Sequence, residues 1–409
     1  MKLPNRFLLR LCFILVLTFQ SYAFAADKII LGDERIEEYL PKLSGKRVAV
    51  FCNHSAMIGQ EHLLDILMKR GQEVTIIFAP EHGVMGDAPA GKAIDSGVDS
   101  VTNIPIFSLY QATVEPVKPT KNEMEKFDVL VIDIQDIGLR YYTYYMNICD
   151  LLEVCAEYDK EVILLDRPNP NGHYVDGPII SDELKGPAGR LPIPVVHGMT
   201  LGELMNMAIG EGWLNLPHKL NFTVIPCKNY THGTAYELPL PPSPNLPNMK
   251  AVYLYPSLCP FEGTTVSVGR GTSIPFQCFG HPALKKEYRY KFIPKSVKSA
   301  PNPLLMNRVC YGVNFSGESE ETLRHKGLDL THVVAAYKIF KSQGLGDKFF
   351  TQKKVGGLGE IRYFDMLMGQ TYVRESVIAG KTAEEIRAMW RDDVTFFIEQ
   401  RKPYLLYEE

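Results

Sequence analysis

The segment VLVIDIQDIGLRYYTYY at residues 129–145 joins an apolar stretch to a cluster of polar and aromatic side chains. Residues 129–134 are apolar except for Asp133, which is typical of a strand buried on both faces of a sheet. A helix is predicted to follow at residues 142–158. Because a buried strand followed by a helix is the repeating unit of a parallel sheet, this segment favours an α/β fold.

The same alternation extends on both sides of this segment. Before it, strands are predicted at residues 47–52, 74–79 and 104–109, with a helix at residues 61–69. After it, strands at residues 162–165 and 222–225 flank a helix that begins at Thr200, with Glu203 completing a capping box. The sequence therefore predicts a parallel sheet covered by helices on both faces.

The pattern changes after a proline-rich stretch at residues 238–247. Beyond it we predict one strand and two long helices, at residues 309–315, 331–342 and 382–400. A domain boundary in the proline-rich stretch would give a first domain at residues 26–245 and a smaller α+β domain at residues 246–409. The same prolines would also suit the wall of a groove.

Residues 1–25 have the three parts of a secretory signal peptide. Lys2, Arg6 and Arg10 precede an apolar run, and Ala23 and Ala25 form an A-x-A cleavage pattern. The apolar run is too short to span a bilayer comfortably, and no other stretch is longer. We expect an exported protein, periplasmic or secreted, without a membrane span after signal cleavage.

The composition is that of an ordinary globular protein. Of 409 residues, 45% are hydrophobic and 22% are charged, with a formal net charge of −3, which excludes a disordered chain and a multi-pass membrane protein. Signal cleavage would remove three positive charges, so no basic excess favours nucleic acid as a partner. It would also leave seven of the eight cysteines. Their odd number and apolar surroundings indicate small buried side chains rather than a disulfide framework.

Polar and aromatic side chains follow four of the predicted strands. Ligands of open α/β sheets bind outside the carboxyl ends of the strands, so these residues predict a functional cleft. Further candidates lie in later loops. The candidates are Asn53, Glu81, His82, Gln135, Asp136, Arg140, Tyr142, Tyr144, Asp166, Arg167, Asn169, His197, Asn245, Glu262 and Arg270.

The sequence motifs of several classes of enzyme are absent from this chain. The first strand is followed by Gly59 alone rather than by G-x-G-x-x-G, and the P-loop-like stretch ending at Lys92 continues with Ala93 instead of Ser or Thr. G-x-S-x-G and H-E-x-x-H are absent from the sequence. We therefore expect no cofactor and no metal, although a metal-dependent hydrolase that uses His54 and His82 is a weaker alternative.

Of the catalytic mechanisms considered, catalysis by carboxyl groups remains. Glu81 lies between Pro80, which restricts the backbone, and Gly83, which allows a tight turn. A carboxyl group held there beside tyrosines is suited to general acid catalysis, and glycoside hydrolysis requires such a group together with a second base or nucleophile. The alternative is a glutamate that only caps the following turn.

Six motifs in this order and spacing resemble the exo-β-N-acetylmuramidase (NamZ-type) family over essentially the whole mature chain. The motifs are PEHG at residues 80–83, DIQDIGLRYYTY at 133–144, DRPNP at 166–170, HGMT at 197–200, FEGT at 261–264 and GRGT at 269–272. The resemblance implies a Rossmann-like N-terminal domain, a smaller C-terminal domain and a cleft between them. It also implies release of N-acetylmuramic acid from the non-reducing end of peptidoglycan fragments during cell-wall turnover and recycling.

Within this resemblance Glu81 corresponds to the catalytic glutamate. The second group stays open between Glu262, Asp136 and the 2-acetamido group of the substrate itself. Either Arg140 or Arg270 is expected to hold the lactyl carboxylate, and either of two tyrosines, Tyr142 and Tyr144, to stack on the sugar.

One position departs from the family pattern. Some members have glutamate before the GRGT motif, where this chain has Val268, so the resemblance implies no carboxylate at that point in this chain. An alternative of a different class is a periplasmic module that binds muropeptides or sugars without catalysis.

Overall fold

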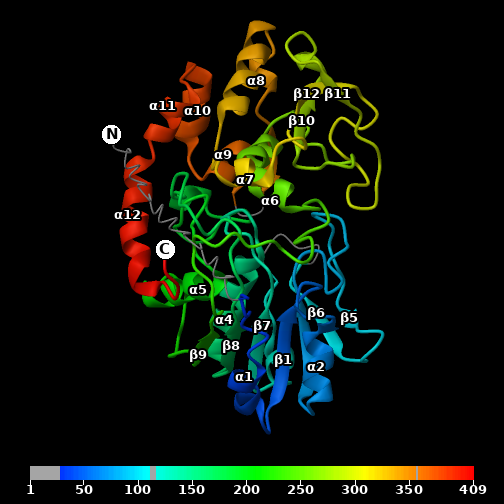
Figure 1. The fold of residues 1–409 in the computed structure, drawn as a ribbon, viewed down its shortest axis with the longest axis vertical. Helices are drawn as coiled ribbons and strands as arrows, with labels where there is room; N and C mark the ends of the chain where they lie inside the picture. The colour runs from blue at the N-terminus through cyan, green and yellow to red at the C-terminus, as the bar shows by residue number, and fades with distance from the viewer. Residues whose placement is uncertain (1–27, 111–116, 356–357) are drawn as a thin grey trace, which may run out of the picture.

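The computed structural model describes residues 28–110, 117–355 and 358–409. The expected signal peptide at residues 1–25 lies outside the described residues. In Figure 1 the large sheet occupies the lower half of the molecule, and the smaller sheets with most of the later helices lie above it. Within the described residues, no helix is both long and apolar enough to cross a membrane.

The large sheet has seven strands and confirms the predicted α/β architecture. All neighbouring strands are parallel except β5, which is antiparallel to β6. From one edge to the other the order is β5 (Gly97–Val98), β6 (Pro105–Ser108), β4 (Glu73–Ala79), β1 (Arg47–Cys52), β7 (Val129–Asp133), β8 (Glu161–Leu165) and β9 (Phe222–Ile225).

The strand order reverses between β1 and β7. From β1 the chain passes outward through β4 and β6, then returns to β7 beside β1 and continues outward through β8 and β9. This is the doubly wound order of Rossmann-like sheets, in which ligands bind at the carboxyl ends near the reversal.

Alternating residues of the strands face two different helical layers. Val48 and Val50 of β1 pack with α1 (Ile36–Leu43) and α2 (Leu63–Lys69). Ala49 and Phe51 belong to the larger core on the other face, together with α3, α4 and α5. These three helices span Lys121–Met124, Tyr144–Glu157 and Leu201–Gly210. Because both faces are covered, the strands read as continuous apolar runs.

The second part of the chain is a mixture of small sheets and helices. An antiparallel sheet has the order β10 (Cys278–His281), β12 (Cys310–Asn314), β11 (Tyr290–Phe292), and β13 (Gln352–Val355) pairs with β14 (Gly359–Arg362). The helices are α6 (Met249–Leu258), α7 (Glu320–Arg324), α8 (Thr331–Ser342), α9 (Tyr363–Met368), α10 (Thr371–Ala379), α11 (Ala383–Ala388) and α12 (Arg391–Arg401). Figure 1 shows α12 descending toward α5.

Two predicted helices differ from the structure for local reasons. The helix expected from residue 61 begins at Leu63, because β3 (Glu61–His62) pairs with β2 (Met57–Ile58) and the His62 side chain caps the helix. The helix expected at residues 382–400 is split into α11 and α12, where Trp390 is buried and its indole N–H donates to Asp176. The capping boxes at Thr200 and Thr382 are confirmed.

The proline-rich stretch lies against the first part of the chain. The carbonyl oxygens of Pro241 and Pro242 accept hydrogen bonds from His54 and Tyr142. This supports its interpretation as a groove wall, whereas the domain boundary at residue 245 stays a prediction. The seven cysteines of the described residues are all free and buried, which confirms their interpretation as small core side chains.

Candidate active site

A cleft of about 1600 Å³ opens at the carboxyl ends of the sheet strands and extends under the second part of the chain. Its walls come from the loop after β4, the start of α4, the proline-rich stretch and the segments around Glu262, Arg270 and β13. Of the fifteen predicted site residues, seven line it: Glu81, His82, Tyr142, Tyr144, Asn245, Glu262 and Arg270.

Glu81 is held at a tight turn that directly follows β4. The next two residues, His82 and Gly83, both have left-handed backbones with φ values of 70° and 75°. Histidine tolerates this conformation better than most side chains, and glycine adopts it freely. The His82 ring also donates from Nδ1 to the Ala88 carbonyl oxygen at 2.6 Å. The loop is therefore folded back on itself, and this fixes where Glu81 points.

Hydrogen bonds orient the Glu81 carboxylate. Its Oε1 accepts from the Gly91 N–H at 2.8 Å. Burial, followed by the charge of Glu81 and a hydrogen bond to it, raises the pKa of Tyr110, which also lines the cleft. These contacts place one carboxylate at a defined position in a cleft wall.

Tyr142 and Tyr144 line the same cleft as Glu81, although only 7% and 2% of their surfaces are exposed. Their ring centroids are 4.9 Å apart in an edge-to-face arrangement, and both hydroxyls donate to the Pro242 carbonyl oxygen. The rings are therefore fixed. Asn245 lines the same wall and donates to the Ser299 carbonyl oxygen, while its own Oδ1 has no partner among the described residues.

Glu262 and Arg270 form the second charged group of the cleft. The guanidinium donates from Nε to Oε1 at 2.7 Å and from Nη2 to Oε2 at 3.3 Å. The same guanidinium lies 4.8 Å from the centroid of the Phe276 ring. This bidentate pair, stacked on an aromatic ring, has a strongly preferred geometry. Val268 lines the cleft as an apolar side chain.

Among the described lining residues, the carboxylates are Glu81, Glu262 and Asp150. Asp150 is held by Arg190 at 2.6 Å and by Lys118 at 3.2 Å. Glu81 has no ion pair to a described residue, and Glu262 has only Arg270. The cleft thus offers two carboxylates for chemistry, one from the loop after β4 and one from the second part of the chain.

Asn53, Gln135 and Asp136 lie outside the cleft lining. Asn53 donates to the Tyr144 hydroxyl, and Gln135 donates to the Asp136 and Pro168 carbonyl oxygens. Burial raises the pKa of Asp136 to about 7, and its Oδ1 accepts from the Gly138 N–H at 2.7 Å. Asn53 therefore supports Tyr144 from outside the cleft, whereas Gln135 and Asp136 bond to backbone groups of neighbouring loops.

Arg140 and His197 are buried away from the cleft. The Arg140 guanidinium donates to three backbone carbonyl oxygens, of Pro178, Ile193 and Leu367. It cannot reach a substrate carboxylate without leaving them. His197 Nδ1 accepts from the Met199 N–H, and burial lowers the pKa of His197 to about 3. Both side chains hold loops together.

Asp166, Arg167 and Asn169 are also structural. Arg167 forms buried ion pairs with Asp33 and Asp133 at 2.5 Å each. Asp166 accepts from the Thr200 hydroxyl and the Gly202 N–H at the start of α5. Asn169 bonds to backbone groups of Asn171 and Met199. The rule that ligands bind at the carboxyl ends of the strands placed these residues at the correct edge of the sheet. Their polar groups, however, are already bonded to other residues of the protein.

Sequence reasoning missed Lys353 and Tyr363 on the far wall of the cleft. The Lys353 ammonium lies 3.4 Å from the centroid of the Tyr363 ring. The sequence TQKKV at residues 351–355 has no alternation of polar and apolar residues that would have pointed to Lys353, although Thr351, Lys353 and Val355 line the cleft.

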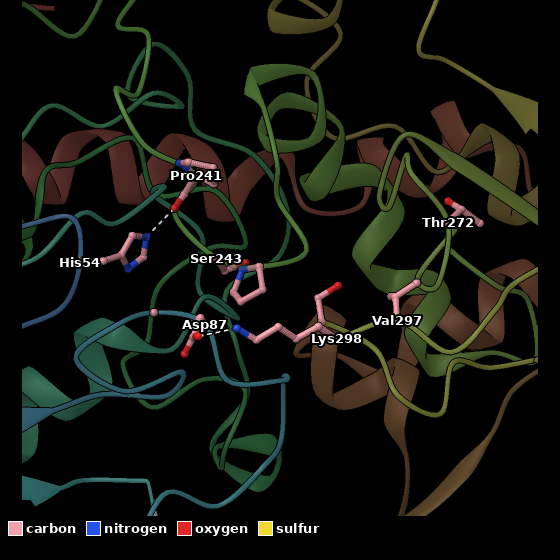
Figure 2. Close-up of a pocket in the computed structure, with 10 residues that line it drawn as sticks. His54, Asp87, Pro241, Ser243, Thr272, Val297 and Lys298 are labelled. Atoms are coloured by element: carbon pink, nitrogen blue, oxygen red, sulfur yellow. Dashed lines mark hydrogen bonds and ion pairs between the residues drawn. The ribbon is translucent and has the colours of Figure 1, made fainter.

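A smaller pocket of about 490 Å³ adjoins the cleft, because Ser243 and Ser299 line both. Figure 2 shows the Asp87 carboxylate meeting the Lys298 ammonium across it, at 2.6 Å. It also shows the His54 ring directed at Pro241, whose carbonyl oxygen accepts from Nε2 at 2.8 Å. Within the described residues, no three His, Cys, Asp or Glu side chains gather as metal ligands.

Two family models match the chain along nearly its whole length. Residues 48–250 match the N-terminal domain of exo-β-N-acetylmuramidase NamZ, and residues 253–407 match its C-terminal domain. The matches together contain Glu81, Glu262 and Arg270.

Individual relatives agree with these matches. The chain is 32% identical over 400 residues to the peptidoglycan β-N-acetylmuramidase NamZ of Bacillus subtilis, covering 92% of this chain and 90% of that protein. Crystal structures of two DUF1343 family proteins from Bacteroides fragilis are similar. One has a TM-score of 0.84 at 49% identity, the other 0.75 at 26% identity, and each covers 93% of this chain and 99% of its own. With both family models matched and this relative aligned, the chain belongs to the exo-β-N-acetylmuramidase NamZ family.

Proposed function

We propose that this protein is an exo-acting glycosidase that releases N-acetylmuramic acid from the non-reducing end of peptidoglycan fragments. The observation that carries the proposal is the single cleft that Glu81, from the loop after β4, and Glu262, from the second part of the chain, both line together with Tyr142 and Tyr144. Two carboxyl groups flanking the scissile bond are what most glycosidases require. The activity in the name of the Bacillus subtilis relative supports the same reaction here.

In this proposal Glu81 protonates the glycosidic oxygen as general acid. Its position is set by the turn at His82 and Gly83 and by the Gly91 N–H, so no reorganisation is needed to present it. Glu262 is the second carboxylate, which acts as base or nucleophile while Arg270 holds its orientation. Glu262 is favoured over Asp136 because Asp136 does not line the cleft.

Tyr142 and Tyr144 are proposed to pack against the sugar ring. Tyr142 and Tyr144 are held by Pro242, so their rings are already immobile before the substrate binds. Aromatic side chains of this kind contribute large contact areas at little cost in conformational entropy. We further propose that the protein is exported and acts in cell-wall turnover and recycling, since residues 1–25 have the pattern of a signal peptide.

The test is digestion of defined glycan fragments that carry N-acetylmuramic acid at the non-reducing end, with products identified by mass spectrometry. We expect the wild-type protein to release free N-acetylmuramic acid and Glu81→Gln to lose about 100-fold or more in kcat. Glu360→Gln is the matched control, because Glu360 is exposed on β14 and does not line the cleft.

Two outcomes would contradict the proposal. If the wild-type protein binds the fragments and never forms product, it is a binding module. If Glu81→Gln turns over a chromogenic muramide at a near-normal rate, the glycosidase assignment to Glu81 is wrong.

A further inference from the structure

Lys353 is directed into the cleft by the pleat of β13. Thr351, Lys353 and Val355 line the cleft, whereas Gln352 and Lys354 between them do not. Successive side chains of a strand point to opposite sides, so this alternation follows from the backbone. It also provides a neighbouring lysine, Lys354, on the other side of the same strand.

Most cations of the cleft are already paired with carboxylates of the protein. Lys118 and Arg190 share Asp150 and Glu153, Lys185 pairs with Asp182, and Arg270 pairs with Glu262. Among the described lining residues, Lys353 and Lys92 form no ion pair with a described residue. These two cations are therefore available for an anionic ligand.

Lys353 is the better placed of the two. Its ammonium lies 3.4 Å from the centroid of the Tyr363 ring, a cation–π contact that fixes its position. Tyr363 lines the same cleft as Glu262 and Glu81, and burial followed by the charge of Glu262 raises its pKa. Lys92 lies in the exposed loop after β4.

The surroundings of Lys353 favour an anion as partner. Partial desolvation lowers the pKa of Lys353, and the charge of Glu262 only partly opposes this effect. Although the Lys353 side chain as a whole is exposed, its ammonium lies against the Tyr363 ring and has no ion pair with a described residue, so a bound carboxylate can pair with it.

Muramic acid differs from glucosamine by a lactyl ether on C3, which carries a carboxylate. We propose that Lys353 binds this lactyl carboxylate and thereby makes the cleft specific for N-acetylmuramic acid over N-acetylglucosamine. The inference rests on the proposed function. Lys353 takes the role that the sequence analysis expected of Arg140 or Arg270. The Arg140 side chain is buried and bonded to backbone carbonyls, and Arg270 is paired with Glu262.

The test is isothermal titration of the full chain with N-acetylmuramic acid and with its neutral lactamide, in which an amide replaces the carboxylate. We expect the wild-type protein to bind the acid about tenfold or more tightly than the amide. Lys353→Gln should bind both equally, with its affinity for the amide unchanged. Lys353→Arg should restore part of the preference, and Lys354→Gln, the matched control, should behave as wild type.

The unchanged affinity for the amide separates the loss of one charge from a damaged fold. If Lys353→Gln keeps the tenfold preference, or if Lys92→Gln removes it instead, the inference is wrong. A wild-type protein that releases N-acetylmuramic acid from glycan fragments without preferring the acid contradicts this inference alone. A wild-type protein that releases none contradicts the proposed function, and this inference with it.

Discussion

Arg270 holds Glu262 through two parallel hydrogen bonds, from Nε to Oε1 at 2.7 Å and from Nη2 to Oε2 at 3.3 Å. The two residues are eight positions apart, and both line the cleft. Since the fork of an arginine matches a carboxylate in both distance and plane, the pair fixes the direction of the Glu262 oxygens. Arg270 is thus a positioning residue in this site rather than a free anion receptor.

The first prediction concerns this pair. Glu262→Gln should reduce kcat on a chromogenic muramide by about 100-fold or more, because it removes the second carboxylate. Arg270→Lys should reduce kcat less, by about tenfold, because a lysine keeps the charge but not the bidentate geometry. Steady-state kinetics of the two variants test this order. A Glu262→Gln variant as active as wild type would exclude Glu262 as the second group.

Arg140 is predicted to act on stability. Its guanidinium is completely buried and donates to the carbonyl oxygens of Pro178, Ile193 and Leu367, so it joins two loops of the first part of the chain to the last turn of α9. Arg140→Lys should lower the free energy of unfolding by about 2–4 kcal/mol, since lysine cannot reach all three carbonyls and leaves buried groups unpaired.

Chemical denaturation measures this effect, and Arg289→Lys on the exposed surface is the control. The KM of the folded Arg140→Lys protein for the muramide should stay close to that of wild type. A selective rise in KM without loss of stability would instead favour the role expected from the sequence.

Asp136 is predicted to make stability depend on pH. Burial raises its pKa to about 7 in the folded protein, against about 3.9 in an unfolded chain. The folded state therefore binds the proton more tightly, and stability falls as the pH rises from about 4 to about 7. Asp136→Asn should flatten this fall. Part of the fall in stability should remain in this variant, because burial also raises the pKa values of Asp166 and Asp365 to about 6.

Thermal unfolding between pH 4 and pH 8 measures the effect of Asp136→Asn. Asp347→Asn, which changes an exposed carboxylate, should leave the curve unaltered. An Asp136→Asn protein whose melting temperature varies with pH as steeply as that of wild type would show that this carboxyl is ionised throughout.

The sequence predicted the sheet and one wall of the cleft better than the other wall. The strands at residues 47–52 and 222–225 have the predicted bounds, because buried parallel strands are continuously apolar. Glu81 was found because it follows a strand directly, and strand ends meet at one edge. The strand order, with β7 returning beside β1, depends on packing between distant segments and has no local signal.

The errors in the site have one physical origin. The strand-end rule locates a polar side chain but does not say whether a partner inside the protein already occupies it. Arg167 is neutralised by Asp33, 134 positions earlier in the chain, and such a pairing cannot be read from spacing. Lys353 was missed for the converse reason, since its hairpin reaches the cleft only through the packing of the second part of the chain.

The last prediction concerns the C-terminal anchor at Tyr407. Its hydroxyl donates to Asp166 Oδ2 at 2.6 Å and accepts from the Cys227 N–H at 2.9 Å. Tyr407→Phe should therefore lower the free energy of unfolding by about 1–3 kcal/mol, because it leaves a buried donor and a buried carboxylate each short of one partner. Tyr404→Phe removes a hydrogen bond to Glu211 at the exposed surface and should cost less.

The pH dependence of Tyr407→Phe distinguishes a lost hydrogen bond from a general loss of packing. Burial raises the pKa of Asp166 to about 6, and the hydrogen bond from Tyr407 opposes this rise. Without that donor the pKa of Asp166 rises further, so the stability of Tyr407→Phe, which declines as the pH rises above 4, should continue to decline beyond pH 6. Denaturation of wild type, Tyr404→Phe and Tyr407→Phe at pH 5 and pH 8 should show the Tyr407→Phe deficit growing with pH. A deficit equal at both values would mean that the tyrosine stabilises the fold by packing alone.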